Sequence, residues 1–236
     1  MKYEKRIDGR KFDEMREMKA KVGIIKRADG SAMFRMGDTI AIAAVYGPRE
    51  LHPKFLQNPR KGILRCNYDL LTFSVPERKK PGPNRRSTEI SLVTKNALLP
   101  SLSLDEFPNT VTDVFIEIIQ ADAGTRCAGI CAASMALADA GLPMKDLVAA
   151  VSVGKVGDKI VVDLDKDEED FEGGTTDIPV AFMPRTGELT LLQLDGEVSK
   201  DDLKEALSLG KKACNEIYKI QQKAIKDVYK EIGKNE

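Results

Sequence analysis

The chain has 236 residues, which is enough to bury a hydrophobic core as one large domain or as two tightly fused ones. Lysine plus arginine and aspartate plus glutamate number 37 each, so the net charge gives no indication of a polyanionic partner. A single histidine, His52, and four cysteines without paired CxxC spacing argue against histidine-based nucleophilic catalysis and the usual zinc sites. The sequence shows no signal peptide or long apolar run, so we expect a cytoplasmic protein without a membrane partner.

Strand-like and helix-like segments alternate along the chain. Hydrophobic patterning predicts strands over about 17–25, 32–35, 40–46, 63–73 and 110–120, a helix after Ser87 and a second helix over about 126–140. Further strands are predicted over 147–153, 159–164, 178–183 and 189–194, with hairpin turns at 157–158 and 186–187, before a long amphipathic helix over about 200–232. This order predicts two α/β halves rather than one doubly wound sheet.

The turn between the strand 110–120 and the helix 126–140 carries the clearest functional signal. Gly124, Thr125 and Arg126 stand directly where the alanine-rich helix begins. The free N–H groups and the positive dipole end of a helix's first turn attract an anion, and arginine can add a bidentate contact. These residues therefore predict a phosphate-binding site; the alternative is an ordinary helix cap beside an exposed arginine.

Two blocks of opposite charge flank this turn. Between residues 51 and 86 the acids are only Asp69 and Glu77, against Lys54, Arg60, Lys61, Arg65, Arg78, Lys79, Lys80, Arg85 and Arg86. Between residues 163 and 177 the acids are Asp163, Asp165, Asp167, Glu168, Glu169, Asp170, Glu172 and Asp177, against Lys166. The first block suits a phosphate backbone and the second a divalent cation; the alternative is two solvated loops.

Six segments resemble motifs of the RNase PH family. In chain order they are 6–10 (RIDGR), 36–39 (MGDT), 84–89 (NRRSTE), 122–126 (DAGTR), 139–144 (DAGLPM) and 177–181 (DIPVA). They cover nearly the whole chain in the family's order, so the resemblance is specific. Within the family, 142–147 and 177–184 are most similar to the catalytic ring subunit of the archaeal exosome; the bacterial tRNA-trimming enzyme is less similar.

The resemblance implies an α/β (α+β) RNase PH fold, with two similar βαβα-type halves packed together and a long C-terminal helix. Residues 1–236 would form a single unit: about 1–145 would carry the phosphate and RNA motifs, and about 146–236 the acidic catalytic loop. The implied activity is a phosphorolytic 3′→5′ exoribonuclease. It would use inorganic phosphate as co-substrate, release nucleoside diphosphates, and tail RNA in reverse.

The phosphate-binding and RNA-binding roles follow from the same resemblance. Gly124, Thr125 and Arg126 would hold the attacking phosphate and aim it in line. Arg85 and Arg86 would grip phosphates of the RNA 3′ end, where a forked guanidinium does better than lysine.

The acidic loop is expected to supply the catalytic groups. Asp177 would be the general acid that protonates the departing 3′ oxygen, and Asp170 with Asp177 would place Mg²⁺ or Mn²⁺. In relatives the two functional aspartates stand one position closer together than Asp170 and Asp177 do here, which a one-residue insertion at two glycines would explain. Glu169 or Glu172 therefore remains an alternative metal ligand, and Glu168 is expected to be a solvated surface charge.

In a ring-shaped relative, the loop that corresponds to the polar loop around Arg60 and Lys61 lines the pore through which single-stranded RNA enters. Arg65, on the following strand, would reach the RNA backbone, and such contacts are electrostatic and independent of sequence. Phe55 in this loop either stacks on RNA bases or packs on its own domain.

The resemblance also implies partners. These are a related inactive RNase PH-like subunit, which would alternate with this chain in a trimer of heterodimers forming a hexameric ring, and RNA-binding cap subunits. Two alternatives stay open: a non-catalytic RNA-binding ring subunit, and a homohexameric tRNA 3′-end phosphorolytic nuclease of the bacterial type.

Overall fold

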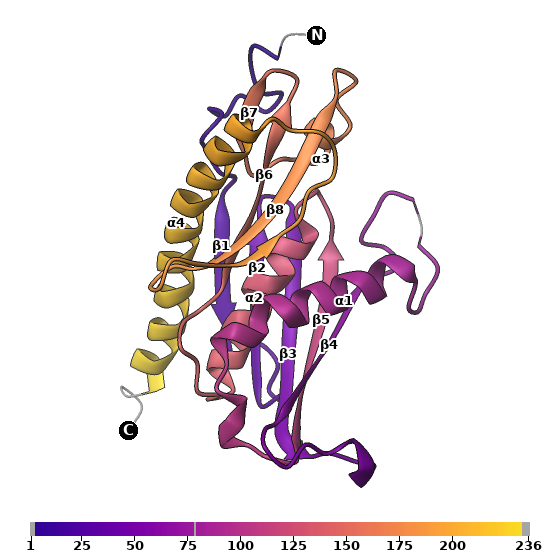
Figure 1. Ribbon diagram of the computed structural model, residues 1–236, viewed down its shortest axis with the longest axis vertical. Coiled ribbons are helices and arrows are strands. Elements are labelled where there is room, and N and C mark those ends of the chain that lie inside the picture. The colour runs from indigo at the N-terminus through magenta and orange to yellow at the C-terminus, as the bar shows by residue number, and fades with distance from the viewer. Residues whose placement is uncertain (1–2, 78, 233–236) are drawn as a thin grey trace.

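The strands form two sheets in a computed structural model that describes residues 3–77 and 79–232, with Arg78 outside the described residues (Figure 1). The first sheet has the order β1-β2-β3-β5-β4 and is antiparallel except for the parallel pair of β4 and β5. Its strands are β1 (Met18–Val22), β2 (Gly30–Met36), β3 (Thr39–Glu50), β4 (Ile63–Leu70) and β5 (Thr110–Gln120). Alternating burial along β5 places one face of this sheet on the core.

The second sheet is wholly antiparallel, in the order β7-β6-β8-β9. Its strands are β6 (Ala149–Val156), β7 (Lys159–Val162), β8 (Thr175–Met183) and β9 (Glu188–Leu192). The predicted hairpin turns fall between β6 and β7 and between β8 and β9, where Gly157 and Gly187 adopt positive φ angles of 58° and 75°. Glycine adopts this left-handed conformation without steric cost, which is why the sequence marked both turns.

Helix α1 (Arg85–Leu98) begins earlier than the sequence suggested, because Asn84 is its N-cap. The Asn84 side chain accepts a hydrogen bond from the Ser87 amide at 2.7 Å, and Ser87 Oγ accepts one from the Asn84 amide at 2.8 Å. This reciprocal capping box makes Ser87 the third residue of the helix.

Helix α2 (Thr125–Asp139) lies between the two sheets, contacting β2, β3 and β5 of the first and β6 and β8 of the second. It is buried on nearly every side, which explains why its sequence is apolar all round rather than amphipathic. Cys127 and Cys131 are fully buried on it, as expected of small core residues.

Helix α4 (Lys200–Ile232) has the predicted bounds and packs along β6, β7, β8 and β1 (Figure 1). Its buried residues recur at helical spacing and are Ala206, Gly210, Ala213, Cys214, Ile217 and Gln221. One continuous core therefore joins both sheets through α2 and α4, which confirms the predicted mixed α/β architecture with a long C-terminal helix. None of the described helices combines the length and apolar composition that a membrane crossing requires.

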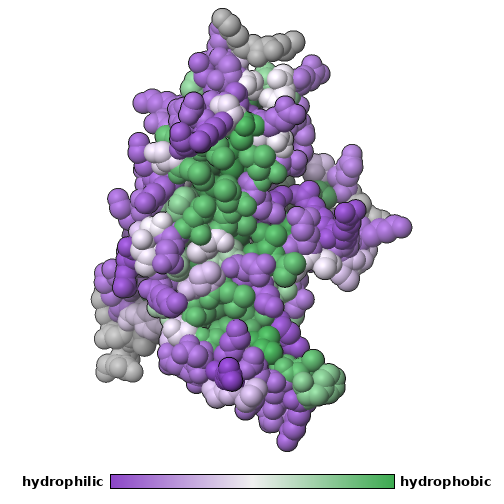
Figure 2. Space-filling model, viewed as in Figure 1, coloured by the Kyte–Doolittle hydropathy of each residue, from purple (hydrophilic) through white to green (hydrophobic). Residues whose placement is uncertain are grey.

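Apolar side chains also remain on the surface. Figure 2 shows them over the middle of the face where β8, β9 and α1 lie, and at the end of the loop that follows β3. Large exposed apolar residues in these segments are Phe55, Leu56, Leu92, Leu189, Leu192 and Leu194. Phe55 is 84% exposed, so it does not pack on its own domain.

The short helix α3 (Lys166–Glu169) was not predicted, and it corrects the expectation for Glu168. Glu168 is fully buried rather than solvated. Its two carboxylate oxygens accept hydrogen bonds from Nε and Nη2 of Arg6, each at 2.7 Å, and one also accepts from the Tyr3 hydroxyl at 2.7 Å. Charge counting along the sequence could not find this pair, because its partners stand 162 positions apart.

Substituting Glu168→Gln should lower the free energy of unfolding by about 3–5 kcal/mol, because Arg6 would stay buried without a counter-charge. Urea denaturation measures this change. Asp201→Asn, which breaks the exposed Asp201–Lys204 pair, is the matched control and should change the free energy of unfolding very little. Equal effects of the two substitutions would contradict the structural role of the buried pair.

Candidate active site

The turn before α2 leaves the N-terminus of this helix without a side-chain cap from the described residues. Ala123 and Gly124 adopt left-handed φ angles of 53° and 61°, and no described side chain caps the first turn. The buried Thr39 hydroxyl fixes the turn: it accepts from the Asp122 amide at 2.9 Å and lies 2.8 and 2.7 Å from the carbonyls of Asp122 and Ala123. The first-turn N–H groups of α2 are thus available to an anion.

Arg16 joins this turn to the acidic loop of the second half. Its guanidinium donates to both carboxylate oxygens of Asp163, at 3.0 and 2.7 Å, and to the carbonyl of Asp122. A Cβ at Gly124 would lie 3.3 Å from Arg16 Nη2, so glycine leaves room for the guanidinium. Sequence analysis did not identify Arg16, because nothing local marks a partner in the other half of the chain.

A cavity of about 280 Å³ opens beside the N-terminus of α2. Its lining residues come from α1, α2, β8 and the segment after β9, and they are Arg86, Glu89, Arg126, Pro179, Gln193, Leu194 and Asp195. Nη1 of Arg126 donates to Oε1 of Gln193 at 2.6 Å, which holds the guanidinium at the cavity. The predicted residues Arg86 and Arg126 are therefore brought together, and Gln193 and Asp195 are additions that sequence analysis missed.

Asp177 lies next to this cavity, on β8. Its backbone exchanges hydrogen bonds with that of Asp195, at 3.0 and 2.9 Å, and its carboxylate accepts one from the Ser152 hydroxyl. Burial raises the pKa of Asp177 above that of an ordinary aspartate, and the Ser152 hydrogen bond and the positive charge of Arg126 offset this only in part. A carboxyl group that holds its proton to higher pH beside two arginines is suited to act as a general acid.

Of the acidic candidates near α3, Glu169 interacts with this cluster. Burial raises the pKa of Glu169, and the negative charge of Asp177 raises it further, against the charges of Arg86 and Arg126. Asp170 instead points to Lys166, with Oδ1 and Nζ 2.7 Å apart, and its side chain is 64% exposed. These electrostatic effects, with the exposure of Asp170, favour the alternative Glu169, and Asp170 stays the residue predicted from motif spacing.

The remaining predicted RNA-binding residues do not line this cavity. Arg85 is exposed on the first turn of α1, next to Arg86. Arg60 and Lys61 are exposed in the loop before β4, at the start of β5 (Figure 1). Since α2 follows the far end of β5, this loop and the α2 N-terminus stand roughly 30 Å apart at 3.3 Å per strand residue.

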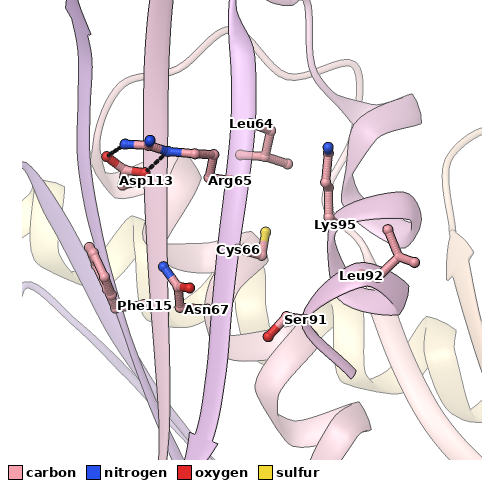
Figure 3. Close-up of a pocket in the computed structure, with 9 residues that line it drawn as sticks. All are labelled: Leu64, Arg65, Cys66, Asn67, Ser91, Leu92, Lys95, Asp113 and Phe115. Atoms are coloured by element: carbon pink, nitrogen blue, oxygen red, sulfur yellow. Dashed lines mark hydrogen bonds and ion pairs between the residues drawn. The ribbon is translucent and has the colours of Figure 1, made fainter. Parts of the chain in front are cut away.

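Arg65 is engaged in an ion pair on β4. Nε and Nη2 donate to the two carboxylate oxygens of Asp113 at 2.6 and 2.8 Å (Figure 3). The pair borders a second cavity of about 460 Å³ between β4 and α1, which shares no lining residue with the cavity at Arg126. Arg65 is therefore not part of the cluster around Asp177.

Comparison with known proteins identifies the family. Residues 14–143 match domain 1 and residues 146–213 match domain 2 of the 3′ exoribonuclease family, RNase PH, and the chain belongs to this family. It is 56% identical over 229 residues to the exosome complex component Rrp41 of Thermococcus kodakarensis, covering 97% of this chain and 91% of the relative. The exosome complex component Rrp41 of Methanopyrus kandleri is 52% identical over 224 residues, covering 95% and 93%.

Solved structures agree on the fold. Rice Rrp46 matches with a TM-score of 0.83 and 26% identity, over 94% of this chain and 100% of its own. An Archaeoglobus fulgidus exosome structure with RNA bound to the active site matches with a TM-score of 0.77 and 24% identity, over 91% of each chain. The expected RNase PH fold is confirmed.

Asp177→Asn should make the protein more stable than the wild type at pH 7. The pKa of Asp177 is raised in the folded protein, so the folded state holds this proton more tightly than the unfolded state does. The free energy of unfolding therefore falls as pH rises above about 3.9, the usual aspartate pKa. Asparagine does not ionise, so the variant does not lose this stability. The difference should shrink as pH falls toward 4, which thermal unfolding across pH measures. Asp202→Asn is the control, and it should make the protein less stable at pH 7. The hydrogen bond from Lys155 lowers the pKa of Asp202, so the ionised carboxylate stabilises the folded state and asparagine loses that contribution. A destabilised Asp177→Asn protein at pH 7 would contradict the electrostatics described here.

Proposed function

We propose that this chain is the catalytic subunit of an archaeal-type exosome ring, a 3′→5′ exoribonuclease that uses inorganic phosphate to release nucleoside diphosphates. The reaction is reversible, so the same site would tail RNA from nucleoside diphosphates. The observation that carries the proposal is the convergence of an uncapped helix N-terminus, two arginines and a carboxyl group with a raised pKa around one cavity. The 3′ exoribonuclease family and the relatives named exosome components support it.

The phosphate would bind at the N-terminus of α2. The amides that follow Gly124, the Thr125 hydroxyl and the Arg126 guanidinium supply donors and positive charge for a dianion. Arg126 is oriented in advance by Gln193, so little side-chain entropy is lost when phosphate binds. Arg86, across the same cavity, would hold the terminal phosphodiester of the RNA, and Arg85 would contact the next phosphate.

One phosphorus–oxygen bond is exchanged for another in each turnover. An oxygen of inorganic phosphate forms a bond to the terminal phosphodiester phosphorus, and the bond from that phosphorus to the 3′ oxygen of the preceding nucleotide breaks. Asp177, protonated, would give its proton to the departing 3′ oxygen, leaving an RNA with a free 3′ hydroxyl and a nucleoside diphosphate. The arginines would stabilise the negative charge that builds on the phosphoryl oxygens.

A divalent cation fits this arrangement only together with the substrate. Within residues 3–77 and 79–232, no group of three or more acidic, histidine or cysteine side chains could hold a metal ion alone. Mg²⁺ characteristically binds through one or two carboxylates plus substrate phosphates and water. Asp177 with Glu169, or with Asp170 after a loop movement, would hold Mg²⁺ or Mn²⁺, which would neutralise phosphate charge.

Partner subunits and an RNA path are part of the proposal. The exposed leucines of α1 and of the segment 189–194 are apolar surface of the kind that neighbouring subunits cover, which supports a ring with a related inactive subunit and cap subunits. The exposed Phe55, with Arg60 and Lys61 in the same loop, would offer stacking and charge to single-stranded RNA well before it reaches the cavity.

The decisive assay uses the assembly purified from its host through a tag on this chain, with 5′-labelled RNA, Mg²⁺ and varied inorganic phosphate. The wild type should shorten RNA only with phosphate and release nucleoside diphosphates. Arg126→Lys should raise the KM for phosphate roughly tenfold or more, since lysine cannot make the bidentate contact. Asp177→Asn should abolish shortening but leave RNA binding intact.

The matched control is Arg65→Lys, which alters an arginine paired with Asp113 outside the cavity and should leave the KM for phosphate unchanged. RNA binding without shortening would make this chain a scaffold subunit. Full activity of the pure chain as a homohexamer would instead favour the bacterial tRNA-trimming type.

A further inference from the structure

The ring of Tyr68 extends from β4 to helix α2 beneath the proposed phosphate site. Tyr68 is 3% exposed, and its amide donates to Ser91 Oγ of α1 at 2.9 Å. A Cβ at Gly129 would lie 3.4 Å from Tyr68 Cε2, so the ring edge rests on α2 at a residue without a side chain. Thr125 is one helical turn before Gly129 on the same face of α2, and it lies near enough to lower the pKa of Tyr68.

The Tyr68 hydroxyl has no hydrogen-bond partner among the described residues. Leaving a buried hydroxyl unpaired costs about 1–3 kcal/mol, so such a group in a native protein calls for an explanation. Burial raises the pKa of Tyr68 to about 12, against the effects of the Thr125 hydroxyl and of Arg86 and Arg126, which all lie near. The hydroxyl therefore stays neutral and able to donate at physiological pH.

A threonine hydroxyl has one hydrogen to donate and two lone pairs that accept. A phosphate dianion at the α2 N-terminus accepts only, so Thr125 can serve it only by directing its hydrogen outward. The lone pairs of Thr125 then turn inward, toward the side on which Tyr68 lies.

Resting on the proposed function, we propose that Tyr68 is a positioning residue for inorganic phosphate. When phosphate binds, the Tyr68 hydroxyl donates to Oγ of Thr125, a hydrogen bond that the structure without phosphate does not contain, and so orients the Thr125 hydrogen toward the bound anion. Successive donors polarise each other, so Thr125 becomes a stronger donor when phosphate is present. Tyr68 acts through Thr125 and does not itself contact the phosphate.

The test is Tyr68→Phe in the purified assembly, with KM determined separately for inorganic phosphate and for RNA. The KM for phosphate should rise about two- to tenfold, the effect of losing one hydrogen bond, and the KM for RNA should not change. The melting temperature should not fall, because the substitution removes a hydroxyl that is unpaired in the absence of phosphate. A purely structural role would instead lower the melting temperature and leave the KM for phosphate unchanged.

Thr94→Val is the matched control. Thr94 Oγ1 is another buried hydroxyl oxygen without a partner among the described residues, and it lies eight residues along α1 from Arg86, or about 12 Å of helix. Its removal should leave both KM values unchanged. A double-mutant cycle with Thr125→Ala tests whether Tyr68 acts through Thr125. Tyr68→Phe should have no further effect on the KM for phosphate in a protein that lacks the Thr125 hydroxyl.

The outcomes separate the two claims. A wild-type enzyme whose activity does not depend on phosphate would overturn the proposed function, and the role of Tyr68 with it. A phosphate-dependent wild type with an unchanged Tyr68→Phe variant would overturn the role of Tyr68 alone. The role of Tyr68 would also be overturned if Tyr68→Phe raised the KM for phosphate by the same factor in the Thr125→Ala protein as in the wild type.

Discussion

The ion pair between Arg16 and Asp163 is the constraint on which the active site depends. Each half of the chain supplies one side of the cavity: α1 and the α2 N-terminus come from the first, and β8 with the segment after β9 comes from the second. Both side chains of the pair are almost completely buried from solvent, and Arg16 also donates to the Asp122 carbonyl in the turn before α2. A guanidinium shared in this way fixes the turn and the acidic segment relative to each other, because breaking a buried pair is costly. The carboxylates and the phosphate donors of the proposed mechanism are thus held at one spacing before any substrate binds.

The burial of α2 affects both the packing of the sheets and the pKa of the carboxyl groups near its N-terminus. The helix can lie close to the first sheet because β2 has a glycine at the contact: a Cβ at Gly30 would lie 2.3 Å from the Ala136 carbonyl oxygen. The same burial at its N-terminal end removes water from around Asp177 and Glu169 and raises the pKa of both carboxyl groups. The stability lost there is characteristic of catalytic sites, where charged groups are held ready for the transition state. The buried Arg6–Glu168 pair ties α3 to the N-terminal segment of the chain.

Local signals in the sequence were enough for the strands and the longer helices, but not for the short helix α3 or the start of α1. The hairpin glycines, the amphipathic α4 and the Gly-Thr-Arg turn each depend on neighbouring residues, and all were predicted. The missed features depend on pairs far apart in the chain: Arg16 with Asp163, Arg6 with Glu168 and Arg126 with Gln193. An acidic run such as 163–172 also cannot reveal from its charges which member turns inward, since the capping box at Asp165 decides that. The sequence therefore indicated Arg86 and Arg126, which line one cavity, and Asp177 beside them, and their roles stay predictions; it did not indicate the groups that orient them.

The central claim is that inorganic phosphate is the nucleophile, and the fate of its phosphorus atom tests it most directly. The purified assembly would be incubated with unlabelled RNA, Mg²⁺ and radiolabelled orthophosphate, and the released nucleotides separated. The account predicts label in the β-phosphate of nucleoside diphosphates, at one labelled atom per nucleotide released. Release of unlabelled nucleoside monophosphates, with all the label left as orthophosphate, would show that water attacks instead and would contradict the account.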